Sequence, residues 1–260
     1  MAIITLTTDF GLKDYYVSAV KGSILNLYAS ANIIDISHEI SPFNDIEAAF
    51  VLKNSYPHFP PGSVHIMGVR VQPASNIPYV AIYADGHYFI GADNGMFSLI
   101  FDKEPDKIIH LEIAQDVNYF SFPVKDIFVK AACHIAQGGS LEKIGTIKTA
   151  LAQKMPHKPN TDNNHIRGIA IYIDVYGNVI TNITKNIFQD IGKGRDFELS
   201  FARGYPINLI SLSYNDVPQG ETLALFGLSG FLEIALNEGM ANKLLSIKLH
   251  DPITIHFEDN

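Results

Sequence analysis

The sequence predicts two domains, an α/β domain with a mostly parallel sheet at residues 1–150 and a smaller all-β, barrel-like domain at residues 166–260. Strands alternate with helices in the first part, a pattern typical of a parallel α/β layer. Short strands separated by turn residues fill the last part, which is typical of a sandwich or barrel. Residues 151–165 are polar and contain Pro156 and Pro159, so we interpret them as a linker.

Apolar runs predict the strands of the first domain. Residues 3–7 form a buried strand, and further strands are predicted at 32–37, 63–71 and 79–84. Asp85-Gly86 is a strong hairpin signal, and it leads into another strand from His87. We expect His87 itself to be a structural residue.

Helical periodicity predicts three helices, at residues 14–28, 45–55 and 125–137. In the first of them, apolar residues recur on one face, at Val17, Val20, Ile24 and Leu27. The third is followed by Gly138-Gly139, a helix stop signal.

In the second domain, strands are predicted at residues 166–174, 179–184, 196–201, 223–227 and 253–257. The run from Phe226 to Asn237 sets Ser229 between glycines ahead of apolar residues. We interpret this run as a turn followed by a core element.

Composition narrows the class of protein. The chain has 260 residues, 47% of them hydrophobic and 18% charged, as expected for a globular protein. A formal charge of −8 argues against binding to nucleic acid, which needs clustered Lys and Arg. We expect no membrane span and no signal peptide, because no suitable apolar run occurs. Cys133 is the only cysteine, which excludes internal disulfides and fits a cytoplasmic location.

A carboxylate follows the first strand. Asp9 lies directly beyond residues 3–7, and ligands of open α/β sheets bind at the carboxyl ends of the strands. A carboxylate accepts two hydrogen bonds at once, which suits the 2′,3′-diol of a ribose. The alternative is that Asp9 orders the turn before the next helix.

Two asparagines beside glycines are further candidates. In Asn94-Gly95 and Gly177-Asn178, each amide offers one acceptor and two donors, the pattern that reads an adenine or an amino acid. The alternative is ordinary turn chemistry. The ten histidines show no metal-binding spacing, and Gly-rich phosphate loops are absent, so we predict neither a metal nor a cofactor.

Six segments in order resemble one known family. They are "TTDFGLKDYYVSAVKG", "IIDISHEISPFNDIEAAFVL", "GHYFIGADNGMFSLI", "KDIFVKAACHIAQGGSLEKIG", "YGNVITNI" and "SGFLEIALNEGMA". These stretches, which span nearly the whole chain, are similar to those of the S-adenosyl-L-methionine (SAM) hydroxide adenosyltransferases, or SAM hydrolases, relatives of the fluorinase and chlorinase. The resemblance implies substitution at C5′ of SAM by water or hydroxide, giving adenosine and methionine. It also implies a homotrimer with SAM bound between subunits.

The resemblance assigns binding roles residue by residue. Asp9 falls on the carboxylate that clamps the ribose, and Phe43 falls where an aromatic ring lines the pocket. Asp174 and Asn178 match the positions that hold the methionine amine and the adenine. The resemblance further places Asn94, Ser229 and Asn237 among the substrate-binding residues.

The chain departs from the family where the water is handled. The hydrolases usually carry "VDPGVGTxRR" after the third strand, whereas this chain has "VRVQPASNIP". The family Asp falls on Arg70, and the family Arg falls on Ile77 or Pro78. The family His falls on Pro123 or Val124, so the catalytic residues are unknown.

Three interpretations of Arg70 stay open: it holds an anion or a substrate carboxylate, the nucleophile apparatus is lost, or it faces solvent or a subunit interface. Asp93 and Asp126 are the nearest alternative bases, and Ser75 is a candidate donor in the same loop. The first hypothesis is therefore a divergent hydrolase. The alternatives are a catalytically silent trimer that binds SAM or another adenosyl compound, as a sensor or scavenger, and an enzyme with a nucleophile other than water.

Overall fold

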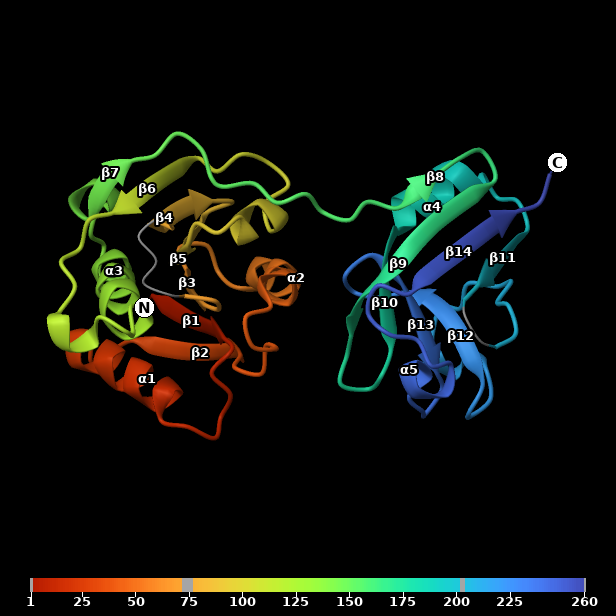
Figure 1. Cartoon of the computed structure of the whole chain (residues 1–260), viewed down its shortest axis with the longest axis horizontal. Helices are drawn as coiled ribbons and strands as arrows, with labels where there is room; N and C mark the ends of the chain where they lie inside the picture. The colour runs from red at the N-terminus through yellow and green to blue at the C-terminus, as the bar shows by residue number, and fades with distance from the viewer. Residues whose placement is uncertain (1, 72–76, 202–203, 260) are drawn as a thin grey trace. The chain divides into compact units, whose positions relative to one another are not determined.

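The structure is a computed structural model that describes residues 2–71, 77–201 and 204–259. The chain divides into two compact units, Met1–Met155 and Pro156–Asn260, each with its own sheet and core (Figure 1). Among the described residues, no helix has the length and apolar character needed to cross a membrane.

A seven-stranded sheet forms the centre of the first unit, in the order β2-β1-β3-β5-β4-β6-β7. The strands are β1 (Ile3–Thr8), β2 (Asn32–Ser37), β3 (Val64–Gly68), β4 (Tyr79–Ala84), β5 (His87–Ala92), β6 (Lys107–Leu111) and β7 (Gly145–Ile147). The first four in spatial order run parallel, and β4, β6 and β7 pair antiparallel with their neighbours. The predicted α/β domain with a mostly parallel sheet is confirmed at the core of this sheet.

Helices cover both faces of this sheet (Figure 1). On one face, α1 (Tyr16–Leu27) and α3 (Val129–Ala136) pack on an apolar cluster that includes Ile4 and Leu6 of β1. On the other, α2 (Asp45–Ser55) packs on a second cluster. The carboxyl ends of β1 and β3 are thereby held at one edge, where α/β sheets bind ligands.

The second unit is an antiparallel sheet in the order β11-β14-β9-β10-β13-β12, with β8 paired to β9. The strands are β8 (Asn160–Thr161), β9 (His165–Ile173), β10 (Val179–Thr184), β11 (Phe197–Ser200), β12 (Thr222–Phe226), β13 (Phe231–Leu236) and β14 (Pro252–Phe257), with two short helices, α4 (Lys185–Gly192) and α5 (Ala241–Leu244). The predicted all-β, barrel-like domain is confirmed.

Several boundaries differ from the prediction for local reasons. The strand predicted to run to residue 71 ends at Gly68, because Arg70 takes a left-handed backbone with φ 51°. The helix predicted from residue 125 begins as a π-helical turn, Val124–Phe128, ahead of α3. Short β8 lies inside the stretch interpreted as a linker, where it pairs with β9.

A buried group of imidazoles lies within the sheet of the first unit. Thr5 Oγ1 lies 2.7 Å from Nδ1 of His65, and Nε2 of His65 lies 3.2 Å from Nδ1 of His87. The His65 ring stacks on Phe89 with centroids 5.0 Å apart. Burial, with His87 adding to it, lowers the pKa of His65 from 6.5 to about 3.

The folded protein should therefore lose stability as the pH falls. The unfolded chain protonates His65 near pH 6.5, whereas the folded chain resists protonation until about pH 3. The stability that His65 contributes is thus complete above pH 6.5 and is lost progressively below it. At pH 5 the free energy of unfolding should have fallen by about 2 kcal/mol on this account. Urea unfolding between pH 5 and 8 measures the change.

Two variants isolate the residue responsible. His65→Gln keeps polar atoms in place but cannot titrate in this range, so its stability should depend much less on pH. His58 is exposed, and His58→Gln should keep the wild-type dependence. If all three proteins lost stability equally between pH 8 and 5, the buried imidazole would not be the cause.

Candidate functional site

In the first unit, Asp9 lies directly after β1 and binds the backbone of Phe43. Its Oδ2 accepts the Phe43 N–H at 2.9 Å. Phe43 has φ 62°, a left-handed conformation that is uncommon for a bulky residue, and it is 61% exposed. Asp9 therefore orders the turn at Phe43, 34 residues along the chain, and not the turn before the next helix that the alternative named. Its Oδ1 has no partner among the described residues and can accept from a ligand, so the ribose role stays a prediction.

The ends of β1 and β2 are tied together beside Asp9. Thr8 Oγ1 lies 2.7 Å from Nδ1 of the buried His38, whose Nε2 lies 3.0 Å from Asp35 Oδ1. The N–H of Gly11, at φ 65°, donates to the His38 carbonyl at 2.7 Å. These contacts hold the backbone on both sides of Asp9, where the chain leaves the sheet.

Arg70 pairs with a buried carboxylate of the same unit. Its Nη1 lies 3.3 Å from Oδ2 of Asp45, and the ammonium of Lys154 binds the same oxygen. The Arg70 side chain is 55% exposed, whereas that of Asp45 is buried. Two cations thus share one carboxylate.

The other positions that the resemblance assigns to the family's water-handling residues carry no titratable side chain. Pro78 supplies its carbonyl to the Asp93 N–H at 2.8 Å, and the Pro123 carbonyl accepts from Phe128 at 3.1 Å in the π-helical turn. Val124 is buried. Ser75 lies outside the described residues.

Both alternative bases are already bound by protein groups. Asp93 accepts the Ala152 N–H at 2.9 Å and lies 3.3 Å from the Lys148 ammonium. Asp126 accepts the N–H of Asp116 at 2.7 Å and pairs with the ammonium of Lys130 at 2.6 Å. Each carboxylate therefore has a structural role.

The Asn94 side chain stabilises a turn through its oxygen, and its amide nitrogen is an unpaired donor within the described residues. Its Oδ1 accepts the Met96 N–H at 3.1 Å, which is the turn chemistry that one alternative predicted. Its Nδ2 is buried without a hydrogen-bond partner among the described residues. A buried donor without a partner costs free energy, so a ligand acceptor there would be favourable.

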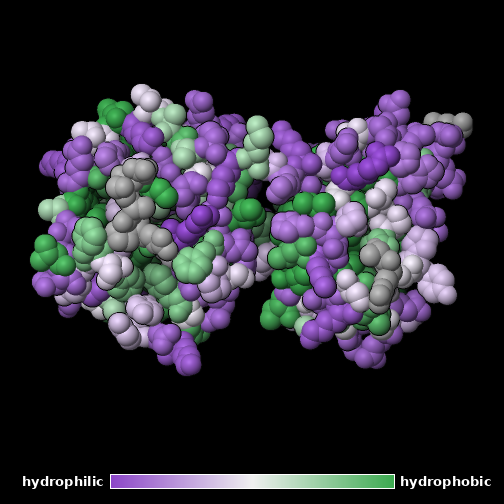
Figure 2. Space-filling view, in the orientation of Figure 1, coloured by the Kyte–Doolittle hydropathy of each residue, from purple (hydrophilic) through white to green (hydrophobic). Residues whose placement is uncertain are grey.

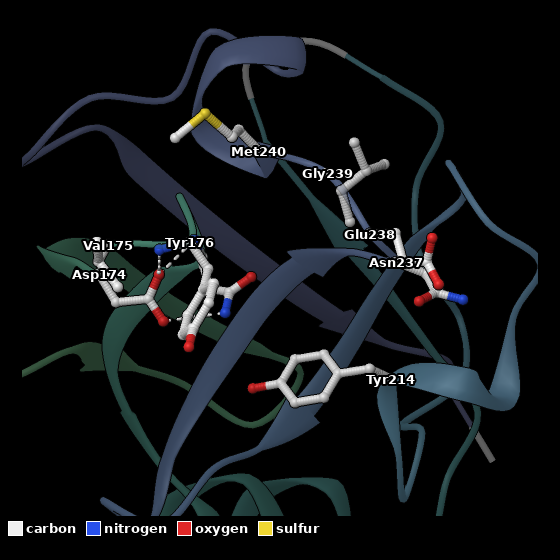
Figure 3. A pocket seen from close by; sticks show the side chains of 10 residues that line it. Asp174, Val175, Tyr176, Tyr214, Asn237, Glu238, Gly239 and Met240 are labelled. Atoms are coloured by element: carbon white, nitrogen blue, oxygen red, sulfur yellow. Dashed lines mark hydrogen bonds between the residues drawn. The ribbon is translucent and has the colours of Figure 1, made fainter.

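The second unit holds a cavity of about 630 Å³ beside β13 (Figure 3). Of the predicted substrate-binding residues, Asp174, Asn178 and Asn237 line it, and Ser229 does not. The remaining lining residues are Val175, Tyr176, Tyr214, Leu236, Glu238, Gly239 and Met240. Hydrophobic side chains also reach the surface of this unit in Figure 2, and Val175, Tyr176 and Met240 are exposed.

Asp174 shapes the wall of this cavity that follows β9. Its Oδ1 accepts the N–H groups of Tyr176 and Asn178, both at 2.9 Å, and its Oδ2 accepts Nδ2 of Asn178 at 2.9 Å (Figure 3). Gly177 has φ 80°, and a side chain there would meet Asn242 at 2.5 Å. The loop therefore needs glycine, and Asn178 has a turn role in addition to facing the cavity.

Asn237 and Ser229 also have local roles. Asn237 is buried, and its Nδ2 donates to the Val217 carbonyl at 2.8 Å. Ser229 lies in the turn between β12 and β13, where its Oγ accepts the Phe231 N–H over a long 3.4 Å.

Two residues of this region, Tyr214 and Glu233, were not predicted from the sequence as part of a site. The Tyr214 hydroxyl donates to Oε1 of Glu233 at 2.6 Å. Burial, with the charge of Asp174 adding to it, raises the pKa of Glu233, and burial likewise raises the pKa of Tyr214. Tyr214 lies in an irregular stretch without periodicity, so no sequence signal pointed to it.

The electrostatics of the cavity favour a cationic ligand. Asp174 and Glu238 line it, and Glu233 lies behind Tyr214. The described residues contain no group of three or more side chains arranged to hold a metal ion. The cavity can thus supply carboxylates and hydrogen-bond acceptors to a positively charged organic molecule.

Comparison with known proteins gives a consistent result over both units. The family model for the SAM hydroxide adenosyltransferase N-terminal domain matches residues 4–145, and that for the C-terminal domain matches residues 168–254. The (R)-S-adenosyl-L-methionine hydrolase of Methanocaldococcus jannaschii is 31% identical over 97% of this chain and 95% of its own. The enzyme of the same name from Thermus thermophilus is 26% identical over 98% and 100%.

A solved structure agrees with these sequence matches. The crystal structure of an uncharacterized conserved protein from Thermotoga maritima has a TM-score of 0.89 and 31% identity to this chain, covering 98% of it and 99% of the other. With both family domains matched in order along its length, the chain belongs to the SAM hydroxide adenosyltransferase family.

Proposed function

We propose that this protein hydrolyses SAM at C5′, releasing adenosine and methionine. The observation that carries the proposal is the similarity to (R)-S-adenosyl-L-methionine hydrolases. The Methanocaldococcus jannaschii enzyme is 31% identical over nearly the full length of both chains. Asp174 and Glu238 in the cavity of the second unit add support, because SAM carries a sulfonium cation. A cytoplasmic location remains a prediction.

The reaction is a single displacement. The oxygen of water or hydroxide forms a bond to C5′ while the C5′–S bond breaks, and the electron pair moves to sulfur. Methionine then leaves as a neutral thioether, and the water proton passes to a base or to solvent. The protein must align the oxygen with the C5′–S bond and exclude other water.

The binding roles follow the family resemblance. Asp9, through its free Oδ1, would hold the ribose diol, with the Phe43 ring against it. Asp174 and Asn178 would hold the methionine amine and the adenine. We further propose a homotrimer in which the first unit of one subunit and the second unit of the next share each ligand.

Among the described residues, neither of the two candidate bases named from the sequence is free to accept a proton from the attacking water. Arginine side chains do not serve as bases at neutral pH. Asp93 and Asp126 are each bound by a lysine and a backbone N–H group. We infer that hydroxide, or water that loses its proton to solvent, is the nucleophile.

A second candidate function rests on the same residues. With Arg70 at the family Asp position and no free carboxylate in its place, a protein that binds SAM without turnover would serve as a sensor or scavenger. Turnover separates the two candidates, because both require binding.

Product analysis tests the proposed function. Purified protein with SAM should form adenosine and methionine in equal amounts, above the spontaneous rate. Asp9→Ala should reduce formation to that rate, since both the Phe43 turn and the ribose acceptor are lost. Asp102→Ala, which alters an exposed carboxylate paired with Lys53, is the control and should retain activity. SAM binding without products would favour the silent binder, and no binding would refute both.

The pH dependence tests the absence of a base. If hydroxide is the nucleophile, log kcat should rise with a slope of about one from pH 7 to 9, because hydroxide increases tenfold per pH unit. Steady-state kinetics with saturating SAM measures the slope. A rate that rises with pH and reaches a plateau below pH 7 would instead reveal a protein base, whereas a rate independent of pH would indicate water that loses its proton to solvent.

A further inference from the structure

Glu233 is a buried acid bound to a residue of the cavity. It lies on β13, is 7% exposed, and accepts the Tyr214 hydroxyl at 2.6 Å. Glu233 does not line the cavity, whereas Tyr214 does. The carboxylate therefore acts on the cavity through the tyrosine.

The surroundings of Glu233 make the burial of its carboxylate unfavourable for the stability of the fold. Across the sheet it pairs with Ile180 on β10 and Leu225 on β12, and both neighbours are buried. Within the described residues, the Tyr214 hydroxyl is the partner found for its carboxylate. An apolar side chain would cost less to bury at this place, so stability does not explain the acid.

Room for the carboxylate is provided by a glycine. A side chain at Gly227 would place a carbon atom 2.7 Å from Oε2 of Glu233. The turn before β13 therefore leaves room for the carboxylate.

The backbone of Tyr214 is fixed as well. Tyr214 begins a single 3₁₀ turn whose capping box joins Ser213 and Asp216. The Asp216 carboxylate accepts the N–H of Leu212 at 2.7 Å and that of Ser213 at 3.1 Å. The ring is thus held at its backbone and at its hydroxyl before any ligand arrives, which lowers the entropy cost of binding.

We propose that Glu233 is a positioning residue that holds the Tyr214 ring as a flat wall for the aromatic base of the ligand. This inference rests on the proposed function, which supplies a ligand with a purine. Tyr214 faces the loop of Asp174 and Tyr176 across the cavity in Figure 3. An aromatic base between them would stack on the Tyr214 ring, whose position is already set by its hydroxyl and its backbone.

Titration calorimetry with adenosine and SAM tests the pair. Tyr214→Phe and Glu233→Leu should each weaken adenosine binding by about two- to tenfold, because the released ring must then be ordered when the ligand binds. Glu233→Gln keeps an oxygen that accepts from the hydroxyl, so its affinity should stay within about threefold of the wild type. Thermal unfolding checks that each variant is folded, and Tyr214→Phe preserves the test if Glu233→Leu does not fold.

A double variant shows whether the two residues act as one unit. Tyr214→Phe/Glu233→Leu should bind adenosine as well as the weaker single variant, because each change breaks the same bond. The matched control is Tyr56→Phe, which removes a hydroxyl bonded to Asp85 at 3.0 Å in the first unit. It should bind adenosine as the wild type does.

The outcomes separate this inference from the proposed function. If the wild type binds SAM, and Tyr214→Phe and Glu233→Leu bind adenosine as tightly as the wild type does, the positioning role is refuted. The proposed function then stands. Additive losses in the double variant would also refute it. If the wild type binds neither SAM nor adenosine, both proposals fail.

Discussion

A carboxylate that follows a strand and accepts the N–H of an exposed aromatic residue is the interaction on which both candidate regions depend. Asp174 follows β9 and accepts from Tyr176, which is 73% exposed. Asp9 follows β1 and accepts from Phe43. Hydrogen bonds to an ionised acceptor are stronger than neutral ones, so each carboxylate holds a loop that would otherwise be free. Each loop places an exposed aromatic side chain next to a carboxylate.

The energetics of the proposed reaction would allow turnover even without the water-handling residues that the resemblance leads us to expect are absent. General acid–base catalysis contributes about 10²–10⁴ in rate, whereas alignment of reacting groups supplies about 7–11 kcal/mol. The sulfonium of SAM already activates C5′, and its leaving group needs no proton. If Asp9 of the first unit and Asp174 and Asn178 of the second bind SAM as proposed, they would supply the larger contribution without a base near Arg70.

Sequence reasoning succeeded where the signal is local. The strands at 32–37 and 79–84 and the helix at 45–55 were predicted with the observed bounds, because apolar runs and turn signals mark them within a few residues. Short β6 and β7 and the helix α4 were missed, since their signals are brief and tertiary pairing stabilises them. The partners of Arg70 and Tyr214 could not be predicted. Asp45 is 25 residues from Arg70, and Glu233 is 19 residues from Tyr214, so only the folded chain joins them.

The central proposal is that the Asp174 loop helps to bind SAM. The most direct test is calorimetric titration of SAM into the wild type and into Asp174→Asn, which places a donor where the loop needs only acceptors. The exposed Asp162, paired with Arg167 at 2.9 Å, provides the control Asp162→Asn. We predict that the wild type and the control bind SAM alike and that Asp174→Asn loses most of its affinity. Equal SAM binding by Asp174→Asn would contradict the account.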